Sequence, residues 1–132
     1  MNKVVARFRD GRLIKGSTSD FVPAKALFHV AEAEAPRGSK PVPVHVKDLK
    51  AVFFVKDFTG RSEYNPTNEF EGDRTPPGRK IRVVFQDGET IVGTTQGYQP
   101  GRPGFFMVPA DSAANIERCF VVAAFTTEVT LL

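Results

Sequence analysis

The stretch Val4-Val5-Ala6-Arg7-Phe8-Arg9-Asp10-Gly11-Arg12-Leu13-Ile14-Lys15-Gly16 returns in altered form at residues 81–93. Both stretches contain a phenylalanine, an Asp-Gly pair, an isoleucine and a glycine at the same spacing, and the offset between them is 77 residues. The same offset, without gaps, still matches Val52 with Val129 near the end of the chain. A repeat at a fixed offset predicts two copies of one structural unit, each of about fifty residues.

Each copy predicts antiparallel strands joined by an Asp-Gly turn. A three-residue loop ending at Gly11 pairs Ala6 with Ile14 and places Phe8 on the same face as Ile14, which gives that face an apolar surface. A two-residue turn would instead place an arginine on this face. The second copy has the same loop ending at Gly88. We therefore expect positive φ at both glycines, because the bulge of such a loop is left-handed.

The remainder of each unit predicts further short strands. Gly16 and Gly93 lie inside the second strand of each unit, where a glycine marks a sharp bend or the close approach of another backbone. The expected strands are 4–9, 12–21, 26–33, 42–46 and 51–55, followed in the second unit by equivalents that include 105–108, 118–124 and 128–132, with one helical turn at 111–115. The predicted fold is all-β, with two tandem five-stranded barrels.

The predicted barrels occupy residues 1–55 and 81–132 and are joined by a linker at 56–80. The linker contains Pro76-Pro77-Gly78 and charges of both signs, and Tyr64 and Phe70 within it are expected to pin it against a barrel. A unit of about fifty residues is near the lower limit for independent folding. Two apolar runs are present, one of Phe53, Phe54, Val55 and Phe58 and one at 120–125. They predict that the units pack together or complete each other by strand pairing, and that remaining edges support a homo-oligomer.

The charge of the chain is concentrated in the first unit. The net charge is +3, and residues 1–55 contain ten Lys or Arg residues against five Asp or Glu residues. Such a distribution suits either an anionic partner or a solvated basic face. The N-terminal residues contain no apolar signal region, no run reaches membrane-spanning length, and a lone Cys119 excludes an internal disulfide framework. These features favour the cytoplasm and no membrane association.

The strand and turn pattern resembles the first motif of the Sm/LSm barrel family, which belongs to the SH3-like small barrels. That motif has alternating apolar positions, an Asn/Asp-Gly turn, a glycine five positions after the glycine of that turn, and an aromatic residue five positions later. The matching residues are Val4, Ala6, Phe8, Asp10, Gly11, Ile14, Gly16 and Phe21, and in the second unit Ile81, Val83, Phe85, Asp87, Gly88, Ile91, Gly93 and Tyr98. The resemblance implies a five-stranded barrel in each unit.

The resemblance has further implications for assembly and for RNA binding. Sm-like units form rings of six or seven, so two units per chain imply a trimer that contains six units. The family's base-binding loop has Asp and Asn where this chain has Val22 and Ala26, or Gln99 and Pro103, and the Arg-Gly pair of its second motif is missing. The match therefore implies the fold without implying RNA binding. The whole chain also resembles conserved bacterial proteins of unassigned function with this duplicated layout.

Two groups of residues are candidates for ligand or partner binding. The first is a basic face, on which outward-facing side chains of the first unit could contact phosphates or simply keep the protein soluble. Its members are Arg7, Arg9 and Lys15, with Lys25, Lys47 and Lys50 from nearby loops and strand ends. The second is the loop from Tyr98 to Phe106, where the two rings could stack on bases and Arg102 could contact a phosphate. Alternatively, the rings of this loop complete the core.

Residue types with catalytic or metal-binding potential are few. His29 and His45 are expected to face outward, with no nearby carboxylate or cysteine at a ligand spacing, and Cys119 is expected to be buried. The sequence predicts no enzyme, no cofactor and no metal. The favoured hypothesis is a non-enzymatic binding or regulatory module that mediates protein–protein interaction or self-assembly. The alternative is binding of single-stranded RNA through the basic first unit and the Tyr98–Phe106 loop.

Overall fold

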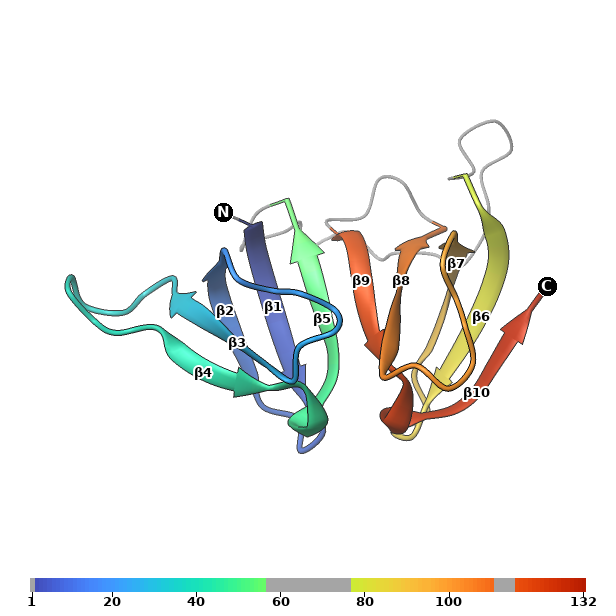
Figure 1. Ribbon diagram of the computed structural model, residues 1–132, viewed down its shortest axis with the longest axis horizontal. Coiled ribbons are helices and arrows are strands. Elements are labelled where there is room, and N and C mark those ends of the chain that lie inside the picture. Colours follow the sequence, from blue (N-terminus) through green and yellow to red (C-terminus); the bar gives the residue numbers. More distant parts are fainter. Residues whose placement is uncertain (1, 57–76, 111–115) are drawn as a thin grey trace.

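The structure is a computed structural model that describes residues 2–56, 77–110 and 116–132. This part of the chain contains strands and two short 3₁₀ turns, and it contains no α-helix (Figure 1). The strands are β1 (Asn2–Phe8), β2 (Leu13–Thr18), β3 (Leu27–Glu32), β4 (Val42–His45), β5 (Leu49–Val55), β6 (Arg79–Phe85), β7 (Thr90–Thr95), β8 (Gly104–Pro109), β9 (Ile116–Val122) and β10 (Thr126–Leu131). The all-β prediction is confirmed.

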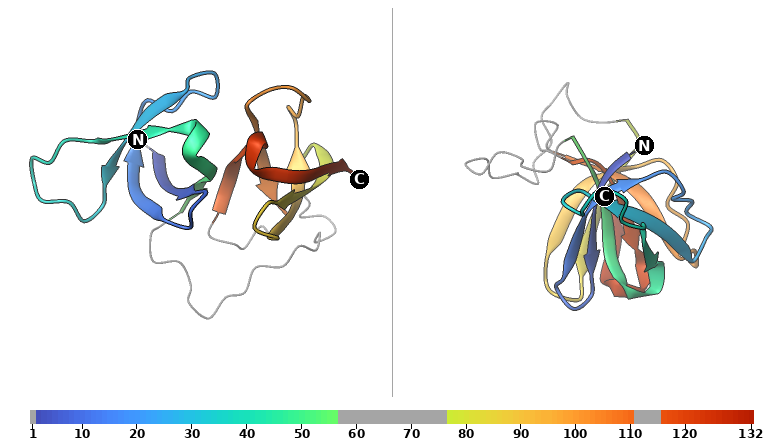
Figure 2. Two further views of the ribbon diagram at one scale, coloured as in Figure 1. Left: turned by 90° about the horizontal axis from the view of Figure 1, so that it is seen from below. Right: turned by 90° about the vertical axis from the view of Figure 1, so that its left-hand side faces the viewer.

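The ten strands form one antiparallel sheet with the order β10-β6-β7-β8-β9-β5-β1-β2-β3-β4. The half made by β1 to β5 and the half made by β6 to β10 have the same internal order and lie side by side (Figures 1 and 2). They join where β5 pairs with β9. The expectation that the units complete each other by strand pairing is therefore confirmed. The sheet is continuous and open, whereas the sequence predicted two separate barrels.

The predicted turn geometry is confirmed in both halves. Ala6 pairs with Ile14, and the backbone N–H of Phe8 donates to the carbonyl oxygen of Arg12, which closes the three-residue loop. Gly11 has φ 92° and Gly88 has φ 91°. Glycine adopts this left-handed conformation without the steric cost that a side chain would add. The turn then directs β2 and β7 back along β1 and β6.

The interior glycine of the second strand allows the close approach that the sequence predicted. A Cβ atom on Gly16 would overlap the carbonyl oxygen of Ala31 on β3, and one on Gly93 would overlap that of Val108 on β8. Both contacts lie where the second and third strands of a half cross. The glycines therefore let β3 and β8 fold over the preceding strand and give each half its curl.

Two hydrophobic clusters form the core of the described part of the chain, and each contains residues from both halves. The first includes Val4, Phe28 and Leu49 together with Phe120 and Val122 of β9. The second gathers the core of β6 to β9 around alternate residues of β5, which are Ala51, Phe53 and Val55. Strands β5 and β9 are apolar on both faces because each face belongs to a different cluster.

Several element boundaries differ from the sequence-based expectation. The predicted strand 12–21 ends at Thr18, because Phe21 turns inward from the following loop to join the first cluster. The 3₁₀ turns Val46–Asp48 and Ala123–Phe125 shorten the predicted strands 42–46 and 118–124. The expectations for Phe58, Tyr64, Phe70 and the helical turn at 111–115 concern residues outside the described part of the chain.

Candidate functional site

The two halves of the sheet are joined by backbone pairing between β5 and β9. In the pairing of β5 with β9, Val52 lies opposite Phe120 and Phe54 lies opposite Arg118. The backbone N–H of Ala123 donates to Pro103 at the far end of the β8–β9 ladder. Because amide directions alternate along a strand, the N–H groups of Phe120 and Arg118 point away from β8 and toward β5.

Aromatic rings from both halves pack across this contact. Phe21, from the loop between β2 and β3, lies 5.0 Å from Phe28 and 5.6 Å from Phe54 of its own half, measured between ring centroids. The same ring lies 5.1 Å from Phe120 and 6.0 Å from Phe106 of the other half. The rings meet edge to face, an arrangement that adds to the stabilisation from burial alone.

Arg118 is an exposed cation that also belongs to this contact. Its guanidinium carbon lies 4.4 Å from the centroid of the Phe54 ring and 4.6 Å from that of Phe106. It therefore covers one ring from each half, and cation–π attraction favours that position. This role was not predictable from the sequence, because Arg118, Phe54 and Phe106 lie on three different strands.

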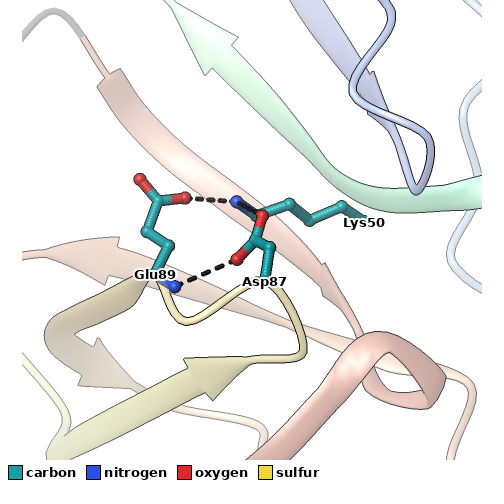
Figure 3. Close-up of polar contacts among 3 residues, drawn as sticks. All are labelled: Lys50, Asp87 and Glu89. Carbon is teal, nitrogen blue, oxygen red and sulfur yellow. Dashed lines mark hydrogen bonds and ion pairs between the residues drawn. The ribbon is translucent and has the colours of Figure 1, made fainter.

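Lys50 is not part of an exposed basic face, contrary to the prediction. Its side chain is only 7% exposed, and its ammonium donates to Asp87 Oδ2 at 2.7 Å and to Glu89 in the β6–β7 turn (Figure 3). The ammonium also lies 4.8 Å from the centroid of the Phe85 ring. The hydrogen bond from Lys50 is the main reason why the pKa of Asp87 lies below its ordinary value. Lys50 thus ties β5 to the other half and is not available to a phosphate ligand.

The outer edge of β4 is poor in hydrogen-bond donors. The backbone N–H of Val46 donates to the carbonyl oxygen of Ala26 and continues the β3–β4 ladder in which Val44 pairs with Phe28. Alternation from Val46 then directs the backbone nitrogens of residues 45, 43 and 41 away from β3. Residues 41 and 43 are prolines, which have no N–H. They occupy the positions equivalent to Arg118 and Phe120, two residues of β9 whose N–H groups face β5.

The outer edge of β10 keeps its hydrogen-bonding groups. The N–H of Leu132 donates to Lys80, in the ladder that pairs Thr130 with Arg82. The N–H groups of Val129 and Leu131 therefore point away from β6. Among the strands of residues 2–56, 77–110 and 116–132, none pairs with this edge.

The side chains beside the β10 edge are also incompletely covered. Val129 and Leu131 are half-buried against the second cluster. Their equivalents on β5 are Val52, with 0% exposure, and Phe54, with 3%. The difference follows from topology, since β9 covers β5 and no described strand covers β10. An extended strand added here would bury apolar surface and satisfy the outward backbone groups together.

The predicted arginines face outward from the first half, as expected, and lie over rings. Arg7 is 5.6 Å from the centroid of Phe53, and Arg9 is 5.8 Å from that of Phe125, measured from the guanidinium carbons. Both side chains are thus placed beside aromatic residues of the second cluster. Their exposed positions are compatible with an anionic ligand and equally with a solubilising role.

The other predicted cations are exposed but come from separate elements. Lys15 lies on β2, Lys25 follows in the β2–β3 loop, and Lys47 lies in the first 3₁₀ turn. Arg102 lies in the β7–β8 loop, at the position equivalent to Lys25. The repeat therefore places one cation on each of these two loops.

The rings of the predicted Tyr98–Phe106 site are packed within the protein. Tyr98 is half-buried and contacts Phe105 edge to face, with 4.8 Å between ring centroids. Phe106 packs against the first cluster, and the cation over its ring is Arg118 rather than Arg102. These contacts correspond to the alternative interpretation in which the rings complete the core.

The titratable residues named from the sequence have structural partners. Cys119 is fully buried, as predicted, and burial raises the pKa of its thiol. His29 faces outward but, against expectation, has a carboxylate partner: its Nδ1 lies 2.7 Å from Asp20 Oδ2. Within the described ranges, no group of three or more His, Cys, Asp or Glu residues is arranged to hold a metal ion.

The β10 edge was not identified from the sequence, although the repeat contained the signal. Alignment of the two copies places Pro41 and Pro43 opposite Arg118 and Phe120, and this difference between the copies marks which edge can pair. The missing information was the strand order, which makes β4 and β10 the outermost strands.

Comparison with known proteins yields one family and no individual relative. No helix in the described segments is both long and apolar enough to cross a membrane. Neither the curated proteins nor the solved structures include a match to the chain. The model of one family matches residues 1–132, which is the whole chain. The protein therefore belongs to the family of unknown function DUF6982.

Proposed function

We propose that the protein is a non-enzymatic binding module whose protein partner adds an extended strand to the outer edge of β10. The observation that carries this proposal is the contrast between the two outermost strands. At the β4 edge, the outward positions 41 and 43 are prolines and His45 alone of the three keeps an N–H, whereas β10 presents the outward N–H groups of Val129 and Leu131. The proposal also includes the finer architecture, in which each half is a curled five-stranded unit derived from a duplication.

Strand addition uses features that the β10 edge already has. Backbone groups of the edge supply affinity for any extended segment, and side-chain pockets on alternate positions supply selectivity. Val129 and Leu131 offer half-buried apolar surface toward one face, and Thr130 lies between them. The partner segment that fits this edge is therefore extended and carries apolar residues at every second position.

Nucleic-acid binding stays an alternative prediction. Its basic residues Arg7, Arg9, Lys25 and Arg102 are exposed, which supports it. Its proposed stacking rings are engaged in the core, and Lys50 is paired with two carboxylates, which makes it the weaker hypothesis. Two results would favour this alternative. The affinity of the protein for single-stranded RNA would fall steeply between about 50 and 200 mM salt, and it would be lower still in the Lys25→Ala/Arg102→Ala variant.

The proposed function is tested by removing the outward donors of β10. In Val129→Pro/Leu131→Pro, each substitution deletes an N–H that faces away from β6, so the β6–β10 ladder keeps its hydrogen bonds. We expect this variant to stay folded and to lose the protein partner that the wild-type protein retains in affinity capture from cells. The partner is then purified, and hydrogen exchange of the complex should show protection of the Val129 and Leu131 amides.

The matched control is Arg7→Ala/Arg9→Ala, which changes the basic face and leaves β10 intact. Strand addition predicts that this control still captures the partner after nuclease treatment. Equal capture by the wild-type protein and the double-proline variant would contradict the proposed function. Capture that nuclease abolishes would favour the nucleic-acid alternative.

A further inference from the structure

We infer that the strand added to β10 is β10 of a second copy of this chain, paired antiparallel about a two-fold axis that passes beside Thr130. This inference rests on the proposed function and names its partner. It concerns the residues Glu128 to Leu131 on each copy. It also predicts that assembly stops at two chains.

The two-fold pairing satisfies the outward backbone groups of Val129 and Leu131 at once. With Thr130 opposite Thr130 of the second copy, Val129 lies opposite Leu131 of that copy, and the reverse pair forms on the other side of the axis. Each of these pairs exchanges two N–H···O bonds, because the N–H groups of Val129 and Leu131 point outward. The dimer ladder then has about four hydrogen bonds, the number that two such hydrogen-bonded pairs supply.

The side chains are compatible with the same register. The half-buried Val129 of one copy lies beside the half-buried Leu131 of the other, so apolar surface covers apolar surface. The central pair is Thr–Thr, a favourable combination across antiparallel strands. Each Glu128 lies near the end of the paired segment, about four residues along from the Glu128 of the other copy. Like charges are therefore not placed opposite one another.

The competing arrangement is the ring implied by the Sm-like resemblance, in which β10 of one chain pairs with β4 of the next. It would repeat the internal contact between β5 and β9 at the same offset. Phe120 and Arg118 are two residues of β9 whose N–H groups face β5, and their equivalents are Pro43 and Pro41. A repeat of that ladder at the β4 edge therefore lacks two of its backbone donors, while His45 keeps its N–H.

The side chains that hold the internal contact are also replaced at the outer positions. Lys50 corresponds to Thr127, and its acceptors Asp87 and Glu89 correspond to Asp10 and Arg12. The ion pair of Lys50 therefore has no equivalent in a ring. The aromatic rings of the internal contact are not repeated at the outer edges either. The positions equivalent to Phe54, Phe106 and Phe120 hold Leu131, His29 and Pro43. The ring trimer stays a prediction, and both ladder and side chains disfavour it relative to the two-fold dimer.

The edge of a single strand makes a small interface, so the dimer is expected to be transient. Stable interfaces bury roughly 1,200 Å² or more, and a few residues on each side bury much less. We expect sedimentation to show a monomer–dimer equilibrium at protein concentrations of about 0.1–1 mM, because weak interfaces are populated only at high concentration. The double-proline variant should remain monomeric over the same range.

A disulfide cross-link tests the register directly. In Thr130→Cys, the two introduced thiols face each other in a non-hydrogen-bonded pair, where Cα atoms are about 4.5 Å apart and a disulfide can form. We expect mild oxidation to yield a covalent dimer. Glu128→Cys is the matched control, because its thiol lies about 13 Å along the strand from its counterpart. The native Cys119 is fully buried and does not compete.

Each outcome has a defined meaning. A covalent Thr130→Cys dimer that disappears when Val129→Pro and Leu131→Pro are added supports the inference. The ring predicts instead a cross-link between Thr130→Cys and Val42→Cys, since Phe53 lies opposite Cys119 in the internal ladder. That result, or a strict monomer without any cross-link, would overturn the two-fold dimer. Partner capture that depends on the β10 donors would still support the proposed function in that case.

Discussion

Lys50 illustrates how one buried cation depends on two half-exposed carboxylates. Its side chain is 7% exposed, while those of Asp87 and Glu89 are 44% and 51% exposed. Removal of the cation leaves carboxylates that water can solvate, whereas removal of the carboxylate charges leaves a buried ammonium without a counterion. Uncompensated buried charge is the more expensive state. The two kinds of substitution should therefore differ in their effect on folding.

We predict that Asp87→Asn/Glu89→Gln lowers the free energy of unfolding by about 3 kcal/mol, and that Lys50→Met lowers it by about 1 kcal/mol. Chemical denaturation at neutral pH measures both values. Lys47→Met provides a control on an exposed lysine and should change stability little. The reverse ranking of the two main variants would show that the ammonium is solvated in solution.

Asp20 predicts a specific loss of stability in acid. Its carboxylate accepts a hydrogen bond from the backbone N–H of His29 at 2.9 Å and contacts the imidazole and Thr18, and these bonds lower its pKa from 3.8 to about 2. A lowered folded-state pKa stabilises the protein above the ordinary pKa, and this stabilisation is lost as the pH falls toward the lower value.

We therefore expect wild-type protein to be more stable than Asp20→Asn at about pH 6, and the difference to vanish between about pH 4 and pH 2. Urea denaturation at a series of pH values tests this. The carboxylate is 43% exposed, so solvent screening keeps the difference small. A constant difference down to pH 2 would mean that Asp20 acts through packing rather than through its charge.

At the scale of the strand, glycine has two distinct roles in this fold. Gly11 has positive φ and open space around it, whereas Gly16 has ordinary backbone angles and lies against the carbonyl oxygen of Ala31. We predict that Gly11→Ala lowers stability by about 1–2 kcal/mol through backbone strain. Gly16→Ala should lower it by about 2–3 kcal/mol, because the β2–β3 contact must open.

Thermal and chemical denaturation compare the two glycine variants. Hydrogen exchange separates their mechanisms: Gly16→Ala should raise exchange in β3, where the carbonyl of Ala31 is displaced. Gly11→Ala should affect only the β1–β2 turn. A milder effect for Gly16→Ala than for Gly11→Ala would contradict the close approach of these strands.

Strand-level features were predictable where the information is local. The Asp-Gly loops, the register of Ala6 with Ile14 and the interior glycines follow from alternation and turn chemistry over about ten residues. The inward turn of Phe21 and the burial of Lys50 were not predictable, since both depend on side chains from the other half. The same limit applies to the candidate site. The sequence does not show which strands are outermost, so it cannot show which backbone N–H groups are left unpaired at an edge.

At the scale of the molecule, neither half has a complete core of its own. The first cluster uses Phe120 and Val122 of the second half, and the second uses Ala51, Phe53 and Val55 of the first. We predict that residues 2–56 and 77–132, produced separately, remain unfolded or aggregate. Mixed or co-expressed, they should form a folded complex with the circular dichroism spectrum of the intact chain.

The reconstitution depends on β5 pairing with β9, which gives it a specific control. Phe54→Pro in the first fragment deletes an N–H that faces β9 and should prevent complex formation. Cooperative melting of either isolated fragment would contradict the shared core. That result would support the boundaries 1–55 and 81–132 as independent domains, which the structure of the whole chain leaves as a prediction.

The two prolines beside β4 have a consequence for the behaviour of the protein in a crowded cell. A head-to-tail contact that does not close into a ring propagates into a fibre. A molecule with a strand edge able to pair at each of its two ends can form such a contact. Pro41 and Pro43 weaken one of the two ends, because they remove two of the three outward backbone donors at the β4 edge. The chain can therefore carry an unprotected strand at its opposite end without becoming the first link of a polymer.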